Sequence, residues 1–205
     1  DRPFLDYLVR ALAAQGTERI VLSVCHKREV IRDYFGESFL GIPVAYSVEE
    51  EPLGTGGAIY QSLGYVRGAD ALVLNGDTFF KLDFRAFMER HAASGCDITI
   101  GLKSLKNCDR YGTVTLTGGR VAGFEEKAPG KSGYINAGVY GIKTDLRERF
   151  PRPGKFSFEA DLLQKEIGRL KVCPFAADGY FIDIGVPEDY LRAQRELSPP
   201  SGEKA

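Results

Sequence analysis

The sequence lacks any run of about 18 apolar residues, so it predicts no membrane-spanning helix. No charged segment followed by an apolar one opens it, and we expect no secretory signal. It has only two histidines, expected at the surface or at helix ends, and no Cys-x-x-Cys pair, which disfavours a zinc site. The four cysteines are expected to be buried and reduced, as in a cytoplasmic protein. These residues are His26, His91, Cys25, Cys96, Cys108 and Cys173.

An excess of charge of one sign is also absent. Lysine and arginine number 27, aspartate and glutamate 28, and the net charge is −1. This balance provides no general field for nucleic acid or an anionic membrane, and the dispersed aromatic residues offer no platform for stacking bases. The length of 205 residues and the even composition predict a single domain over residues 1–197. The tail at 198–205, rich in proline, serine, glycine and charge, is predicted to be disordered.

What is present is an alternation of short apolar strands with amphipathic helices. This alternation predicts a Rossmann-like, GT-A-type α/β fold, with a mostly parallel sheet flanked by helices. In the second half, Gly118-Gly119 separates two strand-like runs and predicts a β-hairpin insertion. Asp83, Ser157 and Pro187 are placed to begin helices. Strands are predicted at 20–24, 44–48, 71–74, 98–102, 111–116, 121–125, 134–142, 170–175 and 180–184.

Two acidic residues interrupt apolar strands where an open α/β sheet binds ligands. Asp77 follows a buried strand that ends in Asn-Gly, and Asp183 lies within Phe-Ile-Asp-Ile-Gly. A carboxylate in such surroundings needs a partner or a cation, and two of them suit Mg²⁺, which prefers carboxylates together with substrate phosphates. The simpler alternative is that Asp77 caps a turn and Asp183 accepts backbone hydrogen bonds.

Three further features have both a functional and a structural interpretation. Residues 54–57, Gly-Thr-Gly-Gly, lie before a helix and could approach a nucleotide, or could form a turn that requires glycine. They form neither a GxGxxG nor a Walker A sequence. Glu49 begins an acidic run that could be solvated or could accept the N–H donors of guanine. Glu126 and Lys127 could bind a sugar phosphate or lie exposed, and Asn136 could be a structural amide.

Taken together, six strings resemble the sugar-1-phosphate nucleotidylyltransferase family and occur in the family's order. The resemblance extends over about residues 1–197. The strings are Glu-Pro-Leu-Gly-Thr-Gly-Gly-Ala at 51–58, Leu-Asn-Gly-Asp-Thr at 74–78, Arg-Tyr-Gly-Thr-Val at 110–114, Phe-Glu-Glu-Lys at 124–127, Ile-Asn-Ala-Gly-Val-Tyr at 135–140 and Phe-Ile-Asp-Ile-Gly-Val-Pro-Glu-Asp-Tyr at 181–190.

This resemblance implies transfer of a nucleotidyl group from a triphosphate to a sugar 1-phosphate, with GTP and D-glycero-α-D-manno-heptose 1-phosphate as the favoured pair. It implies that Asp77 and Asp183 bind Mg²⁺ and, with Lys127, are catalytic. Other positions follow in the same way. Those implied for the nucleotide are Glu49, Leu53, Gly54, Thr55, Asn75 and Gly76, and those for the sugar are Gly112, Glu126, Lys127 and Asn136. The resemblance also suggests a role in bacterial surface polysaccharide assembly and allows a homodimer.

The family carries a glycine-rich loop after a first strand, and neither precedes the stretch at 2–5 here. We therefore expect the natural protein to have that strand and loop before Asp1. Three alternatives stay open from the sequence: a mannose-1-phosphate guanylyltransferase, a thymidylyl- or cytidylyltransferase, and a nucleotide-sugar-binding regulatory module without turnover.

Overall fold

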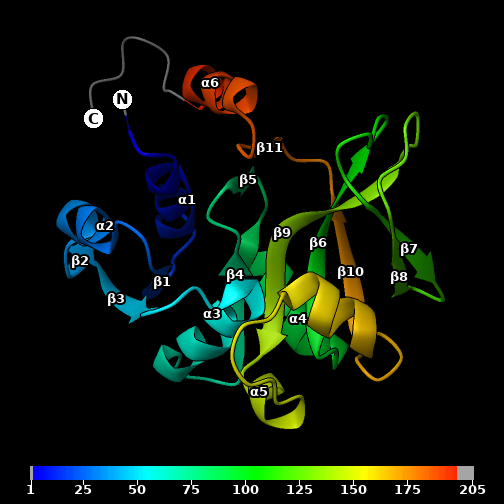
Figure 1. The fold of residues 1–205 in the computed structure, drawn as a ribbon, viewed down its shortest axis with the longest axis horizontal. Helices are drawn as coiled ribbons and strands as arrows, with labels where there is room; N and C mark the ends of the chain where they lie inside the picture. The colour runs from blue at the N-terminus through cyan, green and yellow to red at the C-terminus, as the bar shows by residue number, and fades with distance from the viewer. Residues whose placement is uncertain (1, 198–205) are drawn as a thin grey trace.

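The computed structural model describes residues 2–197, so the tail predicted to be disordered lies outside the described residues. A small sheet with two helices occupies one side of the molecule (Figure 1). Strand β3 pairs in parallel with β1 and antiparallel with β2. Apolar residues of this region, Val9 and Phe35 among them, are buried together. The elements are α1 (Phe4–Ala13), β1 (Ile20–Val24), α2 (Arg28–Phe35), β2 (Ser38–Phe39) and β3 (Ile42–Val48).

A six-stranded sheet forms the centre of the fold, in the order β10-β6-β9-β7-β8, with β4 also paired to β9. Because β6 pairs along one edge of β9, β4 and β7 share the other edge. Strand β7 pairs with β9 up to Ile135 and β4 pairs from Val139 onward, so residues 136–138 lie in the gap between them. The strands are β4 (Asp70–Leu74), β6 (Ile98–Leu105), β7 (Thr113–Thr117), β8 (Arg120–Glu125), β9 (Gly133–Lys143) and β10 (Val172–Ala177).

The α/β architecture with flanking helices is confirmed, but the prediction of a mostly parallel sheet is wrong. Among the described strands two pairings are parallel, β1 with β3 and β6 with β10, and six are antiparallel. The reason is β9, which returns from the second half of the chain and inserts between β4 and β6. Those two strands do run in the same direction, as their connection through a helix requires, but they pair with β9 instead of with each other.

The remaining elements follow the sequence signals closely. Asp83 caps α4 by accepting a hydrogen bond from the Ala86 amide at 2.8 Å, and Ser157 caps the π-helix η2 through the Ala160 amide at 3.1 Å. The glycine stretch predicted to be a turn instead forms the first turn of α3. These elements are α3 (Gly54–Ser62), η1 (Leu63–Tyr65), β5 (Thr78–Phe80), α4 (Phe84–Ser94), α5 (Leu146–Arg149), η2 (Phe158–Gln164), β11 (Phe181–Asp183) and α6 (Pro187–Glu196).

The predicted hairpin insertion is confirmed. Strands β7 and β8 pair antiparallel, and both Gly118 and Gly119 at their turn have positive φ, a conformation that glycine adopts without strain. In Figure 1 this hairpin lies on the far side of β9 from the small β1–β3 sheet. No described helix is long and apolar enough to cross a membrane.

Two features of the interior differ from expectation. His91 lies in the last turn of α4, as expected for a helix end, but it is fully buried, with its Nδ1 2.8 Å from the Thr99 hydroxyl. Burial lowers the pKa of His91. Cys96 and Cys173 form a disulfide instead of remaining reduced. The parallel pairing of β6 with β10 brings these distant cysteines together, with their Cα atoms 6.1 Å apart.

Candidate active site

Asp77 and Asp183 are held beside each other by two hydrogen-bonded segments. Asp183 lies opposite Thr78 in the antiparallel β5–β11 pairing, and the Ile184 amide donates to the Asp77 carbonyl oxygen at 2.9 Å. Each side chain accepts one local hydrogen bond, from the Thr78 hydroxyl at 3.2 Å and from the Gly185 amide at 2.8 Å. Asp77 is exposed and Asp183 is partly exposed. The fold therefore brings the two backbone segments together, and the convergence of the two carboxylates on one site stays a prediction.

The charge around Asp183 is balanced by Arg110, a residue that sequence reasoning did not single out. An Arg110 guanidinium nitrogen lies 3.9 Å from the Asp183 carboxylate, while the same group pairs closely with the buried Asp189 at the start of α6. The hydrogen bond to Asp189 is the main cause of the raised pKa of Arg110. Among the described residues, no cluster of three His, Cys, Asp or Glu side chains could hold a metal by protein ligands alone. A cation here would need further ligands from water or a substrate.

Glu49 positions the segment that precedes α3. Its side chain is 9% exposed, and both carboxylate oxygens accept hydrogen bonds, from the Ser23 hydroxyl at 3.0 Å and the Leu53 amide at 2.8 Å. This arrangement fixes the entry to the Gly-Thr-Gly-Gly segment. The structure therefore gives Glu49 a positioning role, and its predicted contact with the guanine edge stays a prediction.

The glycines at the start of α3 pack against Phe156. A side chain on Gly54 would come within 2.6 Å of the Phe156 carbonyl oxygen, and one on Gly56 would overlap the Phe156 ring. Backbone hydrogen bonds of 3.0 Å join Leu53 and Gly56 to Phe156, and the Thr55 hydroxyl accepts one of 2.9 Å from the Phe158 amide. Tight packing is thus a sufficient reason for these glycines. The result is a closely packed segment at the start of α3, made of residues 53–56 and here called the base loop because the family resemblance implies that it binds the base.

The four residues predicted for the sugar come from three neighbouring strands. Gly112 immediately precedes β7, and a side chain on it would come within 2.7 Å of the Glu125 carbonyl oxygen. Because Glu125 is the last residue of β8, Gly112 lies beside the start of the Glu126-Lys127 segment. Lys127 is exposed and forms no ion pair in the described part of the chain, so its ammonium group is free to meet a phosphate.

Asn136 lies in the gap between β7 and β4 on β9, and a partly buried network of hydrogen bonds fixes its amide. The amide nitrogen donates to the Tyr140 hydroxyl and to the Glu159 carboxylate, each at 2.8 Å, and the amide oxygen accepts from the Gly138 amide at 3.1 Å. The Tyr140 hydroxyl also lies 3.0 Å from Glu159. Burial and the nearby Glu159 raise the pKa of Tyr140 well above its ordinary value, so this hydroxyl keeps its proton.

Asn75 connects this network to the carboxylate pair. Its backbone amide donates to the Gly138 carbonyl oxygen at 2.8 Å, and its side chain packs so closely over Gly138 that a Cβ there would come within 3.0 Å. Gly138 has a φ of 69°, which favours glycine. Gly76 is exposed and leads directly to Asp77. Asn75, Gly76 and Asp77 therefore form one segment that begins at the Asn136 gap.

Sequence reasoning missed three residues that organise the site: Tyr140, Phe156 and Glu159. Tyr140 ends one of the six strings that carry the family resemblance, in which only Asn136 is assigned a role. Glu159 follows a helix-capping serine, where an acidic residue ordinarily has a helix-stabilising role. Phe156 shows its role only through long-range contacts with Leu53 and Gly56. No local signal in the sequence identifies these three residues.

Known proteins resemble this chain in both sequence and fold. The family model described as nucleotidyl transferase matches residues 1–199. A D-glycero-alpha-D-manno-heptose 1-phosphate guanylyltransferase of Aneurinibacillus thermoaerophilus is 44% identical over 197 residues, covering 96% of this chain and 86% of the relative. The enzyme of that name from Campylobacter jejuni is 45% identical over 191 residues, covering 93% and 84%.

A solved structure is similar in its fold as well. HddC from Yersinia pseudotuberculosis, complexed with GMP-PN, superposes with a TM-score of 0.84 at 34% sequence identity. The match covers 96% of this chain and 86% of that one.

Proposed function

Because the chain belongs to the nucleotidyl transferase family, we propose that it transfers GMP from GTP to D-glycero-α-D-manno-heptose 1-phosphate. The products are GDP-heptose and pyrophosphate. The observation that carries this proposal is the identity of 44–45% to two guanylyltransferases of that specificity, over nearly the whole chain. The GMP-PN complex of HddC supports a guanine nucleotide as the donor.

The reaction needs positioning and charge neutralisation more than proton transfer. An oxygen of the sugar phosphate attacks the α-phosphorus of GTP in line, one P–O bond forms, and the bond to the β-phosphate breaks. The attacking oxygen is already anionic, so no general base is required. A site with two carboxylates, an unpaired lysine and ordered amides suits this chemistry, and it contains no nucleophilic triad among the residues singled out.

We assign the donor and acceptor to the two sides of the Asn75–Asp77 segment. The base loop and Glu49 form the guanine side, with backbone groups fixed by Phe156. Asn136, Gly112 and Glu126 form the sugar side, where the Tyr140–Glu159 network fixes the Asn136 amide so that it can meet a sugar hydroxyl. Lys127 is placed to neutralise the sugar phosphate as it approaches the α-phosphate.

The carboxylates of Asp77 and Asp183 fit a divalent cation. Each has one oxygen that accepts no hydrogen bond within the described residues, and hard carboxylate oxygens are the ligands that Mg²⁺ prefers. We infer that these two residues hold Mg²⁺, which when bound would neutralise the charge of the triphosphate. Arg110 places a positive charge near the Asp183 carboxylate and pairs with the Asp189 carboxylate.

A substrate panel tests this proposal. Pyrophosphate release is measured with GTP, ATP, CTP and dTTP, each combined with the heptose 1-phosphate, mannose 1-phosphate or glucose 1-phosphate. We expect the highest kcat/KM for GTP with the heptose 1-phosphate. A preference for mannose 1-phosphate would assign the chain to a different guanylyltransferase. No release with any pair would favour a nucleotide-sugar-binding module.

A further inference from the structure

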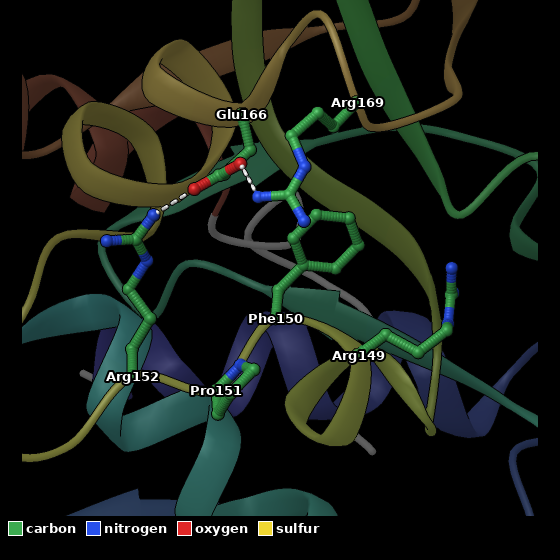
Figure 2. A pocket seen from close by; sticks show the side chains of 6 residues that line it. All are labelled: Arg149, Phe150, Pro151, Arg152, Glu166 and Arg169. Carbon is green, nitrogen blue, oxygen red and sulfur yellow. Dashed lines mark hydrogen bonds and ion pairs between the residues drawn. The ribbon is translucent and has the colours of Figure 1, made fainter.

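A second cluster of cations lies away from the candidate active site, around the end of α5. A cavity of about 200 Å³ is lined by Arg149, Phe150, Pro151, Arg152, Glu166 and Arg169 (Figure 2). It is smaller than the ~300–1,000 Å³ of cavities that hold larger ligands. It therefore has room for a small ion or molecule and not for a nucleotide sugar.

The lining carries three guanidinium groups and one carboxylate. Glu166 is shared between two of them: one of its oxygens lies 2.5 Å from Arg152 and the other 2.9 Å from Arg169. Figure 2 shows this carboxylate between the two arginines. Glu166 therefore compensates only one of the two positive charges that it contacts. Arg149 is separately paired with Asp97 at 2.8 Å and Asp145 at 3.1 Å.

Phe150 orients two of the cations. The guanidinium carbon of Arg169 lies 5.2 Å from the centre of the Phe150 ring, and that of Arg149 lies 5.8 Å from it. Contacts of this kind stabilise a guanidinium over an aromatic face and limit its freedom. Arginines that are already ordered lose little conformational entropy on binding an anion, and their planar groups suit the oxygens of a phosphoryl group.

We propose that this cavity is a second phosphate site, which binds the phosphoryl group of inorganic phosphate or of a small phosphate monoester. In the occupied state, Arg152 and Arg169 donate to the phosphoryl oxygens in place of the Glu166 carboxylate. The site favours an anionic ligand because Arg152 and Arg169 carry two positive charges and share the single negative charge of Glu166.

The cavity and the candidate active site lie at opposite ends of β9. Asn136 is near the start of this strand, about 23 Å along the strand from its last residue, Lys143, which α5 follows. The segment from Phe150 to Arg169 nevertheless contributes residues both to the cavity and to the packing of the base loop. The Tyr60 hydroxyl on α3 donates to the Phe150 carbonyl oxygen at 3.0 Å, and the Tyr60 ring packs on Phe156, which holds the base loop. A phosphate bound in the cavity could therefore affect the position of α3, the helix that begins with the base loop, through the contacts of Tyr60.

The binding test uses the whole chain and no turnover, so it is independent of the proposed function. The Nε–H NMR signals of Arg152 and Arg169 are followed during titration with inorganic phosphate, or with glycerol 3-phosphate, at constant ionic strength held with chloride. Each signal is identified by its loss in the corresponding Arg→Lys variant. We expect saturating shifts with inorganic phosphate, with the monoester, or with both, and the two arms show which source the site prefers.

Three variants separate a built site from general ion binding. Glu166→Gln removes the competing carboxylate and should tighten phosphate binding a few-fold. Arg169→Gln should weaken it a few-fold, and its side chain is 71% exposed, so this variant should fold. Arg120→Gln, on the exposed β8 end, is the matched control for lost charge and should leave the affinity unchanged. Shifts that do not saturate, or an affinity that is the same in all three variants, would overturn the proposal.

A second arm, which rests on the proposed function, tests the coupling. Phosphate at a concentration near its Kd for the wild type should change the KM for GTP by a larger factor in the wild type than in Arg169→Gln, because the cavity of the variant is then less occupied. If binding is observed but both proteins give the same factor, the cavity is a phosphate site that does not act on the base loop.

Discussion

The Ile184 amide donates a 2.9 Å hydrogen bond to the Asp77 carbonyl oxygen, and this bond places the Asp77 and Asp183 segments side by side. The two residues are more than a hundred positions apart in the sequence. Their proximity depends on the antiparallel pairing of β5 with β11. The pair is therefore a product of the complete fold, and it can be tested separately from the residues that bind the base and the sugar.

The Tyr140 hydroxyl fixes Asn136, so Tyr140→Phe should weaken the sugar side of the site. Losing a buried hydrogen bond costs about 1 kcal/mol, and the Asn136 amide would lose one acceptor. We expect the KM for the heptose 1-phosphate to rise about five- to tenfold, with little change in the KM for GTP. Steady-state kinetics with each substrate varied in turn will measure this. An equal rise in both KM values would contradict a role confined to the sugar.

Glu49 joins the base loop to β1 through Ser23, so Glu49→Ala should both destabilise the protein and impair GTP binding. The Leu53 amide and the Ser23 hydroxyl would lose their protein acceptor, and because Ser23 is exposed and Leu53 partly exposed, the cost is about 1 kcal/mol in the free energy of unfolding. Denaturant titration measures the first effect and the KM for GTP the second. Ser23→Ala is the control: it removes one of the two bonds and should have the smaller effect on both.

His91 should make the protein less stable in mild acid. Burial lowers the pKa of His91 in the folded state, beside Asp70 and Lys143, whereas in the unfolded chain it is near 6.5. The unfolded state therefore binds the proton first as the pH falls. The stabilisation is complete above about pH 6.5 and is lost below it, by at most about 1.4 kcal/mol per pH unit.

The variant His91→Asn isolates this contribution, since its amide can still meet the Thr99 hydroxyl but does not titrate. We expect the free energy of unfolding to fall less steeply from pH 7 to pH 5 in the variant than in the wild type. Carboxylates other than Asp70, which lies 3.3 Å from His91, contribute equally to both proteins. Identical slopes would mean that His91 does not change its protonation state on unfolding.

The disulfide between Cys96 and Cys173 should protect two of the four cysteines from alkylation. Mass spectrometry after denaturation and alkylation without reductant should find label on Cys25 and Cys108 only. Reduction should lower the free energy of unfolding by about 2–4 kcal/mol, because the bond closes a long loop. Label on all four cysteines in unreduced protein would contradict the bond.

Much of the fold could be predicted from local patterns, because most elements here carry local signals. The caps at Asp83 and Ser157, the Gly118-Gly119 hairpin and the apolar strands are all properties of a few adjacent residues. The insertion of β9 between β4 and β6 could not be predicted in this way, because strand order depends on pairing between distant segments. The burial of His91 escaped prediction because helical spacing alone does not say which face of α4 meets the sheet.

The residues of the candidate site likewise fall into those with a local sequence signal and those without one. Asp77, Asp183 and Asn136 interrupt apolar strands, and a polar residue in such a place calls for an explanation. Glu159 and Phe156 do not break any apolar strand pattern. Glu159 matters through its contact with Asn136, and Phe156 through its contact with Gly56. Residues that position others are for this reason harder to identify from sequence than those that contact a substrate.

The most direct test of the central claim is the rate of pyrophosphate release by Asp77→Asn and Asp183→Asn, with Asp33→Asn, an exposed carboxylate outside the site, as the matched control. Measured with GTP, the heptose 1-phosphate and Mg²⁺, both site variants should lose about 10²–10³-fold in kcat, while circular dichroism and Tm stay near the wild-type values. Asp33→Asn should retain full activity. Near wild-type turnover in either site variant would contradict the assignment of this carboxylate pair as the centre of guanylyl transfer.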